Sequence, residues 1–342
     1  MFGYDLGIDL GTSSIVIAVP DKGVVINEPS YVAYDKETEK ILYAGRRAYY
    51  LQGREPIGVE VEQPIKDGAI SNYSLTQQML KYFIDRVIKK SIFRPRVVAS
   101  VPALATDVEK RTLISVIITA GARSVCLVEE PLCAAFGAGI DPIHPNGVFV
   151  IDIGGGTTDM AVVTQGSMSQ TETVKIAGND FDAEIMRYMR DKYDVLIGVR
   201  TAEEIKRAIG CAVPRTEEIK MSAKGRSVQG GVPMVVEVSS NEICECLQPL
   251  FKELTSAAQV MFERTSPQLV ADITSGEVLL TGGCAELYGI DRLFADALGL
   301  EVRAVAHPNL CAAKGASIAL SKMHILDNYG YRFKTKDDVR IR

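Results

Sequence analysis

The sequence predicts an α/β protein built from two related halves, each a mixed β-sheet covered by helices, facing each other across a cleft. The stretch "LGIDLGTSSIVIAV" at residues 6–19 has the same layout as "FVIDIGGGTTDMAVV" at residues 149–163. Both consist of an apolar strand with an aspartate near its end, a glycine-rich turn with hydroxyl side chains, and a second apolar strand. The same order of elements then follows each copy, which indicates an internal duplication.

Each half is expected to begin with three consecutive strands. In the first half, "DKG" at 21–23 leads into a third strand, "VVINEPSYVAY" at 24–34. In the second half, "QGS" at 165–167 leads into "SQTETVKIA" at 169–177. Apolar runs joined by such short turns predict an antiparallel meander in each half.

Beyond the meanders, both halves alternate between helical and strand patterns. This order adds two parallel strands to each meander, so the prediction is two mixed five-stranded sheets covered by helices. The first half gives a helix at 75–90, a strand at 96–102, a helix at 106–121, a strand at 124–130 and a helix at 131–139. The second half gives a helix at 180–193 and, after a long interruption, a strand at 277–283, a helix at 286–298, a strand at 300–306 and a helix at 310–323.

Composition fits a globular protein with a sizeable core. Of 342 residues, 47% are hydrophobic and 24% charged, and the net charge of -5 gives no general attraction to nucleic acid. The seven cysteines have neither CxxC spacing nor paired histidines, so reduced thiols are expected. The start of the chain lacks a signal-peptide pattern, and no apolar run reaches the ~18 residues that span a bilayer. A cytoplasmic protein without nucleic-acid partners is therefore expected.

The duplicated turns suit a bound nucleotide. Backbone N–H groups of a tight glycine turn can converge on a phosphate, because glycine permits unusual dihedrals and close approach. A carboxylate beside phosphates would repel them unless a divalent cation lay between, so we interpret Asp9 and Asp152 as Mg²⁺ ligands. The alternative for either turn alone is a glycine-rich hairpin with a solvated aspartate. The phosphate-binding residues would be Gly11, Thr12, Ser13, Gly154, Gly155, Gly156 and Thr157.

Further segments carry a family resemblance. "EEP" at 129–131, "AGNDFD" at 177–182, "VLLTGGCAEL" at 278–287 and "AAKGASIAL" at 312–320 resemble the ATPase superfamily of actin, sugar kinases and heat-shock chaperones. Within it, segments such as "PIKDGAISNY" and "GARSVCLVEEPLCAAFGAG" are most similar to the MreB family of bacterial actins, over about residues 5–325. The chain has neither a GxxxxGK[ST] nor a GxGxxG sequence, which argues against a P-loop or Rossmann site.

The resemblance implies an actin-like ATPase fold: two duplicated ribonuclease-H-like halves around a nucleotide cleft, each with a smaller inserted subdomain. The implied subdomains are IA at 1–32, 66–145 and about 312–330; IB at 33–65; IIA at 146–179 and about 241–311; IIB at 180–240; and a C-terminal tail at 331–342.

The resemblance also implies roles for residues outside the turns. Glu130, the second glutamate of "EEP", is the one associated with the attacking water, and Thr157 would help to hold that water. For Glu129 we expect only a carboxylate stabilised by the start of a helix. Glu203 and Lys206 share a helix face and would contact ribose and adenine, although alone they would be taken for a surface ion pair. Gly282 and Gly283 would let the adenine approach backbone, although by themselves they indicate a plain turn.

Four positions depart from the usual MreB pattern. The first turn reads "GTSS" instead of Gly-Thr-Ala-Asn, so Ser13 or Ser14 must replace an asparagine donor. Asp159 stands where glutamate is usual, and Cys284 where a third glycine is usual. A side chain at 284 is expected to crowd the adenine.

A membrane contact is expected at "KKSIFRPRV". Ile92 and Phe93 lie between lysines and arginines in a loop, and apolar residues flanked by cations suit an anionic lipid interface. In MreB proteins, a hydrophobic loop at this place contacts the membrane. The alternative is that both side chains enter the core.

The functional prediction is an ATP- and Mg²⁺-dependent ATPase that forms homopolymers, with paired protofilaments, at the inner face of the plasma membrane. Its partners would be membrane proteins of the wall-elongation machinery, and its role the organisation of wall growth and rod shape. The alternatives are a filament that positions organelles or plasmids, a monomeric chaperone-type ATPase, and a small-metabolite kinase. The chain lacks room for a chaperone's substrate domain and has no clear catalytic aspartate for a kinase.

Overall fold

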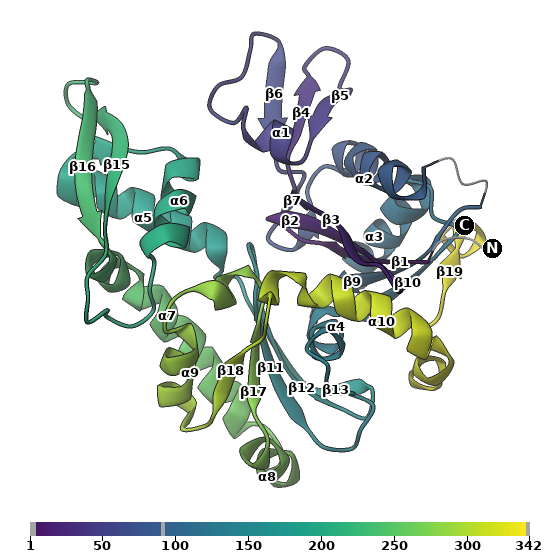
Figure 1. Cartoon of the computed structure of the whole chain (residues 1–342). Coiled ribbons are helices and arrows are strands. Elements are labelled where there is room, and N and C mark those ends of the chain that lie inside the picture. Colours follow the sequence, from purple (N-terminus) through teal and green to yellow (C-terminus); the bar gives the residue numbers. More distant parts are fainter. Residues whose placement is uncertain (1–4, 90–92, 340–342) are drawn as a thin grey trace.

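The computed structural model describes residues 5–89 and 93–339 and shows two lobes, each built around one mixed β-sheet (Figure 1). The strand order of the first sheet is β19-β10-β9-β1-β2-β3, and that of the second is β13-β12-β11-β17-β18. The first sheet comprises β1 (Asp5–Leu10), β2 (Ser14–Val19), β3 (Gly23–Pro29), β9 (Arg96–Val101), β10 (Ser124–Glu129) and β19 (Lys334–Thr335). The second comprises β11 (Val148–Ile153), β12 (Thr158–Thr164), β13 (Ser167–Val174), β17 (Val278–Thr281) and β18 (Val302–Ala304).

The two sheets confirm the duplication. In each, the first three strands form an antiparallel meander and the next two add in parallel beside the first strand. Asp9 pairs with Val16 in the first meander, and Asp152 pairs with Asp159 in the second. Equivalent pairing places the two glycine-rich turns at equivalent corners of their sheets.

Two sequence predictions about the first sheet were wrong. The expected third strand at 24–34 is two strands, since β3 ends at Pro29 and β4 (Val32–Asp35) belongs to a separate small sheet. Proline has no N–H with which to continue the ladder, and Ser30 turns the chain by donating its hydroxyl to the carbonyl oxygen of Gly11 at 2.7 Å. The sheet also has a sixth strand, because β19 near the C-terminus pairs with β10.

Helices α4 (Glu130–Gly137) and α10 (Cys311–Leu326) lie between the two sheets and join the lobes (Figure 1). One buried cluster combines their side chains with residues of both sheets. The helices touch backbone to backbone: a Cβ at Gly315 would lie 1.7 Å from the carbonyl oxygen of Cys133, and one at Gly137 would lie 2.1 Å from that of Cys311. Only glycine leaves room for this contact.

Two helices cover the outer face of the first sheet. Helix α2 (Tyr73–Ile88) begins where the side chain of Asn72 accepts a hydrogen bond from the N–H of Leu75. Helix α3 (Asp107–Thr119) begins with a capping box between Thr106 and Glu109. Their apolar faces fill the core of the first lobe beside β1, β2, β9 and β10.

The inserted segments form small units at the free end of each lobe (Figure 1). In the first lobe, the sheet β5-β4-β6 comprises β4, β5 (Ile41–Ala44) and β6 (Val59–Glu62), with α1 (Arg46–Tyr49) beside it. In the second, α5 (Gly178–Tyr193) and α6 (Val199–Ile209) accompany the sheet of β14 (Val195–Leu196), β15 (Lys220–Ser227) and β16 (Pro233–Ser239).

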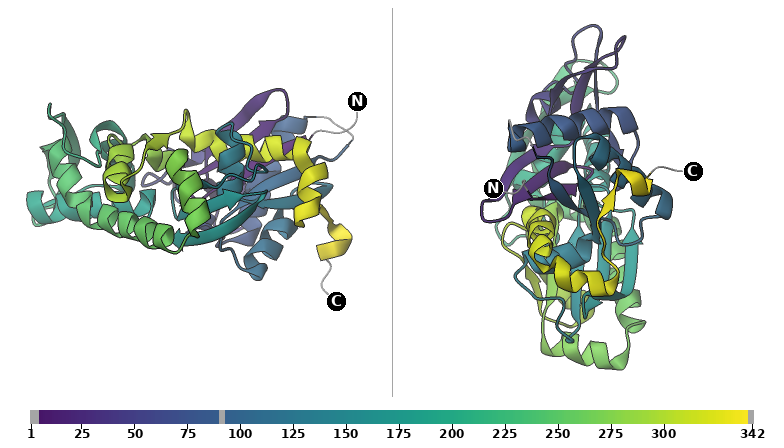
Figure 2. Two further views of the ribbon diagram at one scale, coloured as in Figure 1. Left: turned by 90° about the horizontal axis from the view of Figure 1, so that it is seen from below. Right: turned by 90° about the vertical axis from the view of Figure 1, so that its right-hand side faces the viewer.

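The second lobe is organised by α7 (Ser240–Glu263), a helix that the sequence analysis did not identify. It is one long element, flanked by α8 (Pro267–Ser275) and α9 (Ile290–Leu298), and it packs in the same core cluster as α5 and the main sheet. Figure 2 shows the green α7 running along the length of this lobe.

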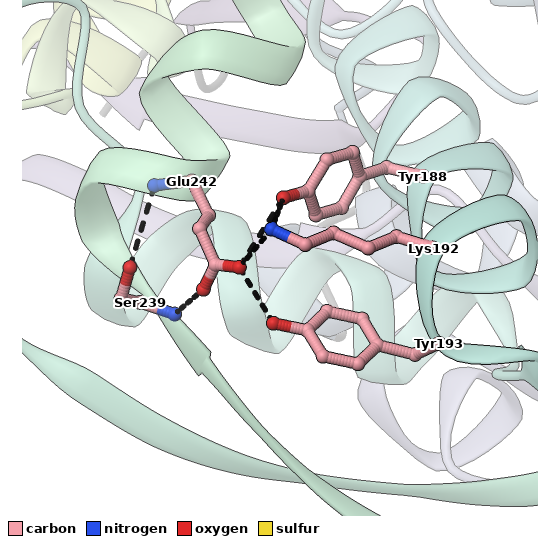
Figure 3. A network of polar contacts seen from close by, with 5 residues as sticks. All are labelled: Tyr188, Lys192, Tyr193, Ser239 and Glu242. Carbon is pink, nitrogen blue, oxygen red and sulfur yellow. Dashed lines mark hydrogen bonds and ion pairs between the residues drawn. The ribbon is translucent and has the colours of Figure 1, made fainter.

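A polar network fixes the start of α7 to the end of α5 (Figure 3). Glu242 accepts hydrogen bonds from Tyr193 at 2.6 Å and from the N–H of Ser239 at 2.9 Å, and it also pairs with Lys192. Burial opposes ionisation of Glu242, but these hydrogen bonds outweigh it and lower its pKa to about 2. The carboxylate is therefore ionised, and holds the two helices together, across the physiological pH range.

Within residues 5–89 and 93–339, no helix combines the length and apolarity needed to cross a bilayer. Of the predicted membrane loop, Ile92 lies outside the described residues. Phe93 is 60% exposed, so this side chain is not part of the core.

Candidate nucleotide-binding site

A cavity of about 1120 Å³ lies between the two lobes, and both glycine-rich turns form part of its wall. The structure brings together in this wall every residue that the sequence analysis assigned to metal, phosphate, ribose, base or water. These are Asp9, Gly11, Thr12, Ser13, Glu130, Asp152, Gly154, Gly155, Gly156, Thr157, Glu203, Lys206, Gly282 and Gly283. Cys284 lines the same cavity.

The two turns pack directly against each other. A Cβ at Gly155 would lie 2.0 Å from the hydroxyl oxygen of Ser13, and one at Gly156 would lie 2.7 Å from that of Thr12. None of Gly11, Gly154, Gly155 and Gly156 has a positive φ. The expectation that these glycines serve special dihedrals was therefore wrong, and their role is to let the turns approach closely.

Hydrogen bonds fix the shape of each turn. In the first, the N–H of Gly11 donates to the carbonyl oxygen of Ser14 at 3.0 Å, and the hydroxyl oxygen of Thr12 accepts from the N–H of Gly68 at 2.9 Å. In the second, the N–H of Gly154 donates to the carbonyl oxygen of Thr157 at 3.0 Å. The turns are thus held in place by the protein itself, as a preorganised anion site requires.

Cys284 is part of the support of the second turn. It is 6% exposed, and its thiol donates to the carbonyl oxygen of Gly154 at 3.4 Å. Its Sγ also lies 3.0 Å from the position of a Cβ at Gly178, where α5 begins. The sulfur therefore fills the space between the second turn and α5.

Four carboxyl groups gather beneath the turns. Burial raises the pKa of Asp9 to about 6, although a hydrogen bond from Ser100 at 2.7 Å opposes the rise. Burial and the charge of Asp9 raise the pKa of Asp152 to about 7. The pKa of Glu130 is raised well above its ordinary value by burial and by the charges of Asp159, Asp9 and Asp152. The cluster is therefore short of positive charge.

Asp159 lies behind this group rather than in the cavity wall. One of its oxygens accepts from the N–H of Ala103 at 3.0 Å and from the hydroxyl of Thr173 at 2.7 Å. The other oxygen is buried without a hydrogen-bond partner among the described residues. Asp159 thus links the second turn to the first lobe, and it adds negative charge beside Glu130.

The chemistry of these residues fits Mg²⁺. The described part of the chain has no group of three or more His, Cys, Asp or Glu side chains placed to hold a metal ion among them. Mg²⁺, however, commonly binds through one or two carboxylates, with water and substrate phosphates completing its coordination. Asp9 and Asp152 offer two, and a divalent cation would favour their ionised forms against the burial that raises both pKa values and the charge of Asp9 that adds to the rise at Asp152.

The structure separates the two glutamates of "EEP". Glu130 is the first residue of α4 and lines the cavity, whereas Glu129 does not. Glu129 is the N-cap residue but makes no side-chain cap hydrogen bond. It accepts instead from the hydroxyl of Tyr331 at 2.8 Å and pairs with Lys110 at 3.6 Å, so its partners come from α3 and the C-terminal segment. Glu129 does stand at the start of a helix as expected, and its stabilisation by that helix stays a prediction.

Glu203 and Lys206 line the cavity from α6, but each already has a partner. Lys206 donates to the carbonyl oxygen of Gly178 at 2.7 Å and to Asp182 at 2.8 Å, and both side chains of this ion pair are nearly buried. Glu203 accepts from the hydroxyl of Tyr49 at 2.7 Å. Lys206 therefore also holds α6 to the start of α5, beside the second turn.

Gly282 and Gly283 differ in what they accommodate. A Cβ at Gly282 would lie 2.5 Å from a carboxylate oxygen of Asp152 and 2.3 Å from the carbonyl oxygen of Ile153, and its φ is 81°. Apart from its chain neighbours, no described residue has an atom within 4 Å of a Cβ built at Gly283. Gly282 therefore lets the backbone pass close to Asp152, and of the two glycines only Gly283 leaves open space for a ligand.

Sequence reasoning missed residues that reach the cavity from the inserted segments. Tyr49 belongs to the first lobe, and its bond to Glu203 joins residues 154 positions apart. The guanidinium of Arg200 lies over the rings of Tyr49 and Tyr50, at 5.2 and 5.1 Å from their centroids. No sequence pattern marks this contact between the lobes. Asp182 was also missed, although the "AGNDFD" segment that contains it could have pointed to it.

Comparison with known proteins agrees with this architecture. The family model for MreB/Mbl proteins matches residues 3–328. The cell shape-determining protein Mbl of Bacillus cereus is 41% identical over 333 residues, covering 97% of this chain and 100% of that protein. The cell shape-determining protein MreB of Escherichia coli is 40% identical over 336 residues, covering 96% of each chain. A crystal structure of MreB 5 of Spiroplasma citri bound to AMPPNP superposes with a TM-score of 0.90 at 33% identity, covering 96% of this chain and 99% of that one. The chain therefore belongs to the MreB/Mbl family and has its actin-like, two-lobed α/β fold.

Proposed function

We propose that this protein binds ATP with Mg²⁺ in the cavity between its lobes, hydrolyses it slowly, and polymerises in the ATP-bound form into membrane-associated filaments that organise wall growth and cell shape. The observation that carries the proposal is the meeting of both duplicated turns, two aspartates and Glu130 in the wall of one cavity. The AMPPNP complex of the Spiroplasma citri relative and the cell-shape role named for the Mbl and MreB relatives support it.

Different residues would carry out different parts of the proposed hydrolysis. Backbone N–H groups and hydroxyls of the two turns would bind the phosphates, and Asp9 and Asp152 would hold Mg²⁺. Bound Mg²⁺ supplies charge neutralisation at the phosphates. Glu130 would accept a hydrogen bond from the attacking water, with Thr157 as a second contact, so that the water is oriented in line with the γ-phosphate.

Measuring ATP binding and phosphate release separately tests this role of Glu130. Orienting the water acts on the transition state, so Glu130→Ala should slow phosphate release about 100-fold or more while nucleotide affinity stays within about threefold. Filaments should still form and should persist longer. Glu129→Ala is the matched control and should have the smaller kinetic effect. A parallel collapse of affinity and turnover, or a larger defect in Glu129→Ala, would contradict the assignment.

Self-assembly is tested by sedimentation with ATP and Mg²⁺. The filament proposal predicts a pellet that depends on nucleotide and protein concentration, whereas a monomeric chaperone-type ATPase or a metabolite kinase would stay in the supernatant. Assembly on the inner face of the membrane, together with membrane proteins of the wall-elongation machinery, belongs to the same proposal. Flotation with anionic liposomes tests its lipid part, and absence of a pellet under all nucleotide conditions would overturn the proposal.

A further inference from the structure

The carboxylate of Glu130 has no hydrogen-bonding side chain to hold it among the described residues. Burial disfavours its charged form, and the charges of Asp159, Asp9 and Asp152 add repulsion. Its direction therefore depends on the backbone at the junction where β10 ends at Glu129 and α4 begins at Glu130. A small change at this junction would move the carboxylate within the cavity.

The junction is tied down from outside the cavity by Glu129. Its side chain is 16% exposed, and both of its oxygens have partners. One accepts the hydroxyl of Tyr331 at 2.8 Å, and the other faces the ammonium of Lys110, on α3, at 3.6 Å. Hydrogen bonds to a carboxylate are stronger than those between neutral groups, so this contact restrains the backbone next to Glu130.

Tyr331 is itself held by the C-terminal segment. The N–H of Tyr331 donates to the carbonyl oxygen of Leu326 at 3.2 Å, and β19 pairs with β10 at Lys334 and Thr335. Between these anchors, the guanidinium of Arg96 lies 5.4 Å from the ring centroid of Phe333. The rings of Tyr331 and Phe333 pack against the core cluster shared by α4 and α10. Figure 1 shows β19 at the outer edge of the sheet, next to β10.

We propose that Tyr331 is a positioning residue for the proposed hydrolysis: the segment 331–335 clamps the β10–α4 junction through Glu129 and so sets where Glu130 points. The inference rests on the proposed function, because it assumes that Glu130 orients the water. The match to the family model ends at residue 328, before this segment begins. Burial and the charge of Glu129 raise the pKa of Tyr331, so its hydroxyl is protonated and can donate at neutral pH.

The test compares variants that remove or preserve this one hydrogen bond. Tyr331→Phe removes only the hydroxyl and should lower kcat for ATP about three- to tenfold, with KM within about twofold. Glu129→Gln keeps an acceptor oxygen and should retain more turnover than Glu129→Ala. Tyr329→Phe is the matched control: Tyr329 is 43% exposed, its hydroxyl bonds no described residue, and its variant should match the wild type.

A second measurement reads the junction directly in the nucleotide-free protein. Amide hydrogen exchange of a peptide spanning residues 127–136 should be faster in Tyr331→Phe than in the wild type or Tyr329→Phe. The double variant Tyr331→Phe/Glu129→Ala should be no slower in turnover than Glu129→Ala alone, because both changes break the same contact.

The outcomes separate the inference from the proposed function. Wild-type turnover and exchange rates in Tyr331→Phe would overturn the inference, as would faster exchange with unchanged kcat. Full additivity in the double variant would also overturn it. A wild-type protein without ATP turnover would overturn the proposed hydrolysis instead, and the exchange measurement would then decide whether Tyr331 holds the junction.

Discussion

Replacing Asp152 with asparagine should stabilise the nucleotide-free protein while removing its Mg²⁺-dependent binding of nucleotide. Asp152 is 8% exposed, and burial together with the charge of Asp9 raises its pKa from 3.8 to about 7. A raised carboxyl pKa means that the folded state resists ionisation, so the stability present below pH ~4 is lost as the pH rises through about 7. Asparagine carries no charge at any pH and escapes this loss.

The size of the effect follows from the difference between the two pKa values. From 3.8 to about 7, at about 1.4 kcal/mol for each pH unit, the ionised carboxylate costs at most about 4 kcal/mol at pH 8. Electrostatic relaxation reduces this figure, so we expect Asp152→Asn to gain about 2 to 4 kcal/mol at pH 8. For a cooperatively unfolding unit of about 150 to 250 residues, this gain raises the melting temperature by about 6 to 12 °C. At pH 4 the gain should fall below about 1 kcal/mol, because Asp152 is then protonated in the folded state and, with an unfolded pKa of 3.8, only partly ionised in the unfolded state.

Thermal unfolding in EDTA, without nucleotide, at pH 4 and pH 8 measures this directly. A parallel titration with ATP at pH 8, with and without Mg²⁺, should show that Asp152→Asn has lost the Mg²⁺-dependent part of binding, as should Asp152→Ala. Lower stability of the asparagine variant at pH 8, or the same shift in melting temperature at both pH values, would refute the electrostatic argument. Unchanged Mg²⁺-dependent turnover would rule out the two-carboxylate site.

Three further changes test other parts of the structure. Gly315→Ala should lower the free energy of unfolding by more than about 3 kcal/mol or prevent folding, because its Cβ would overlap a backbone carbonyl of α4. Gly198→Ala, with open space around its Cβ, is the control and should be nearly neutral. Similar melting temperatures for the two variants would contradict the backbone contact. Glu242→Gln should lose about 1 to 3 kcal/mol of unfolding free energy at pH 7, measured with urea, and nothing near pH 2. The reason is that the stability gained from a lowered pKa is lost as the pH falls from 4.5 to about 2. An equal loss at both pH values would exclude this cause. The double variant Ile92→Ser/Phe93→Ser should still pellet with ATP but fail to float with anionic liposomes, because each filament subunit would lose apolar contact with lipid. Raised salt should weaken the flotation of the wild type. Full flotation of the variant would exclude the loop as the anchor.

The sequence determined much of this protein because much of its information is local. An apolar strand, an aspartate and a glycine turn lie within about fifteen consecutive residues, and the second copy shows that the pattern is not accidental. Period-two and helical patterns then predict the order of strands and helices. Duplicated turns at equivalent corners of two sheets indicate one shared cleft, so the two aspartates and the turn residues could be named from the pattern itself. The other site residues, Glu130, Glu203, Lys206, Gly282 and Gly283, were named from the resemblance to the MreB family.

The tertiary structure alone decided which contacts those residues make. Glu129 accepts a hydrogen bond from Tyr331, 202 residues away in sequence, while its neighbour Glu130 lines the cavity. The approach of Gly155 to Ser13 likewise depends on how the two lobes pack. The strand β19 is only two residues long, too short for any periodicity, and it forms because β10 offers it an unpaired edge. Short-range patterns specify elements, whereas contacts between distant segments are selected by packing and hydrogen bonding in the folded chain.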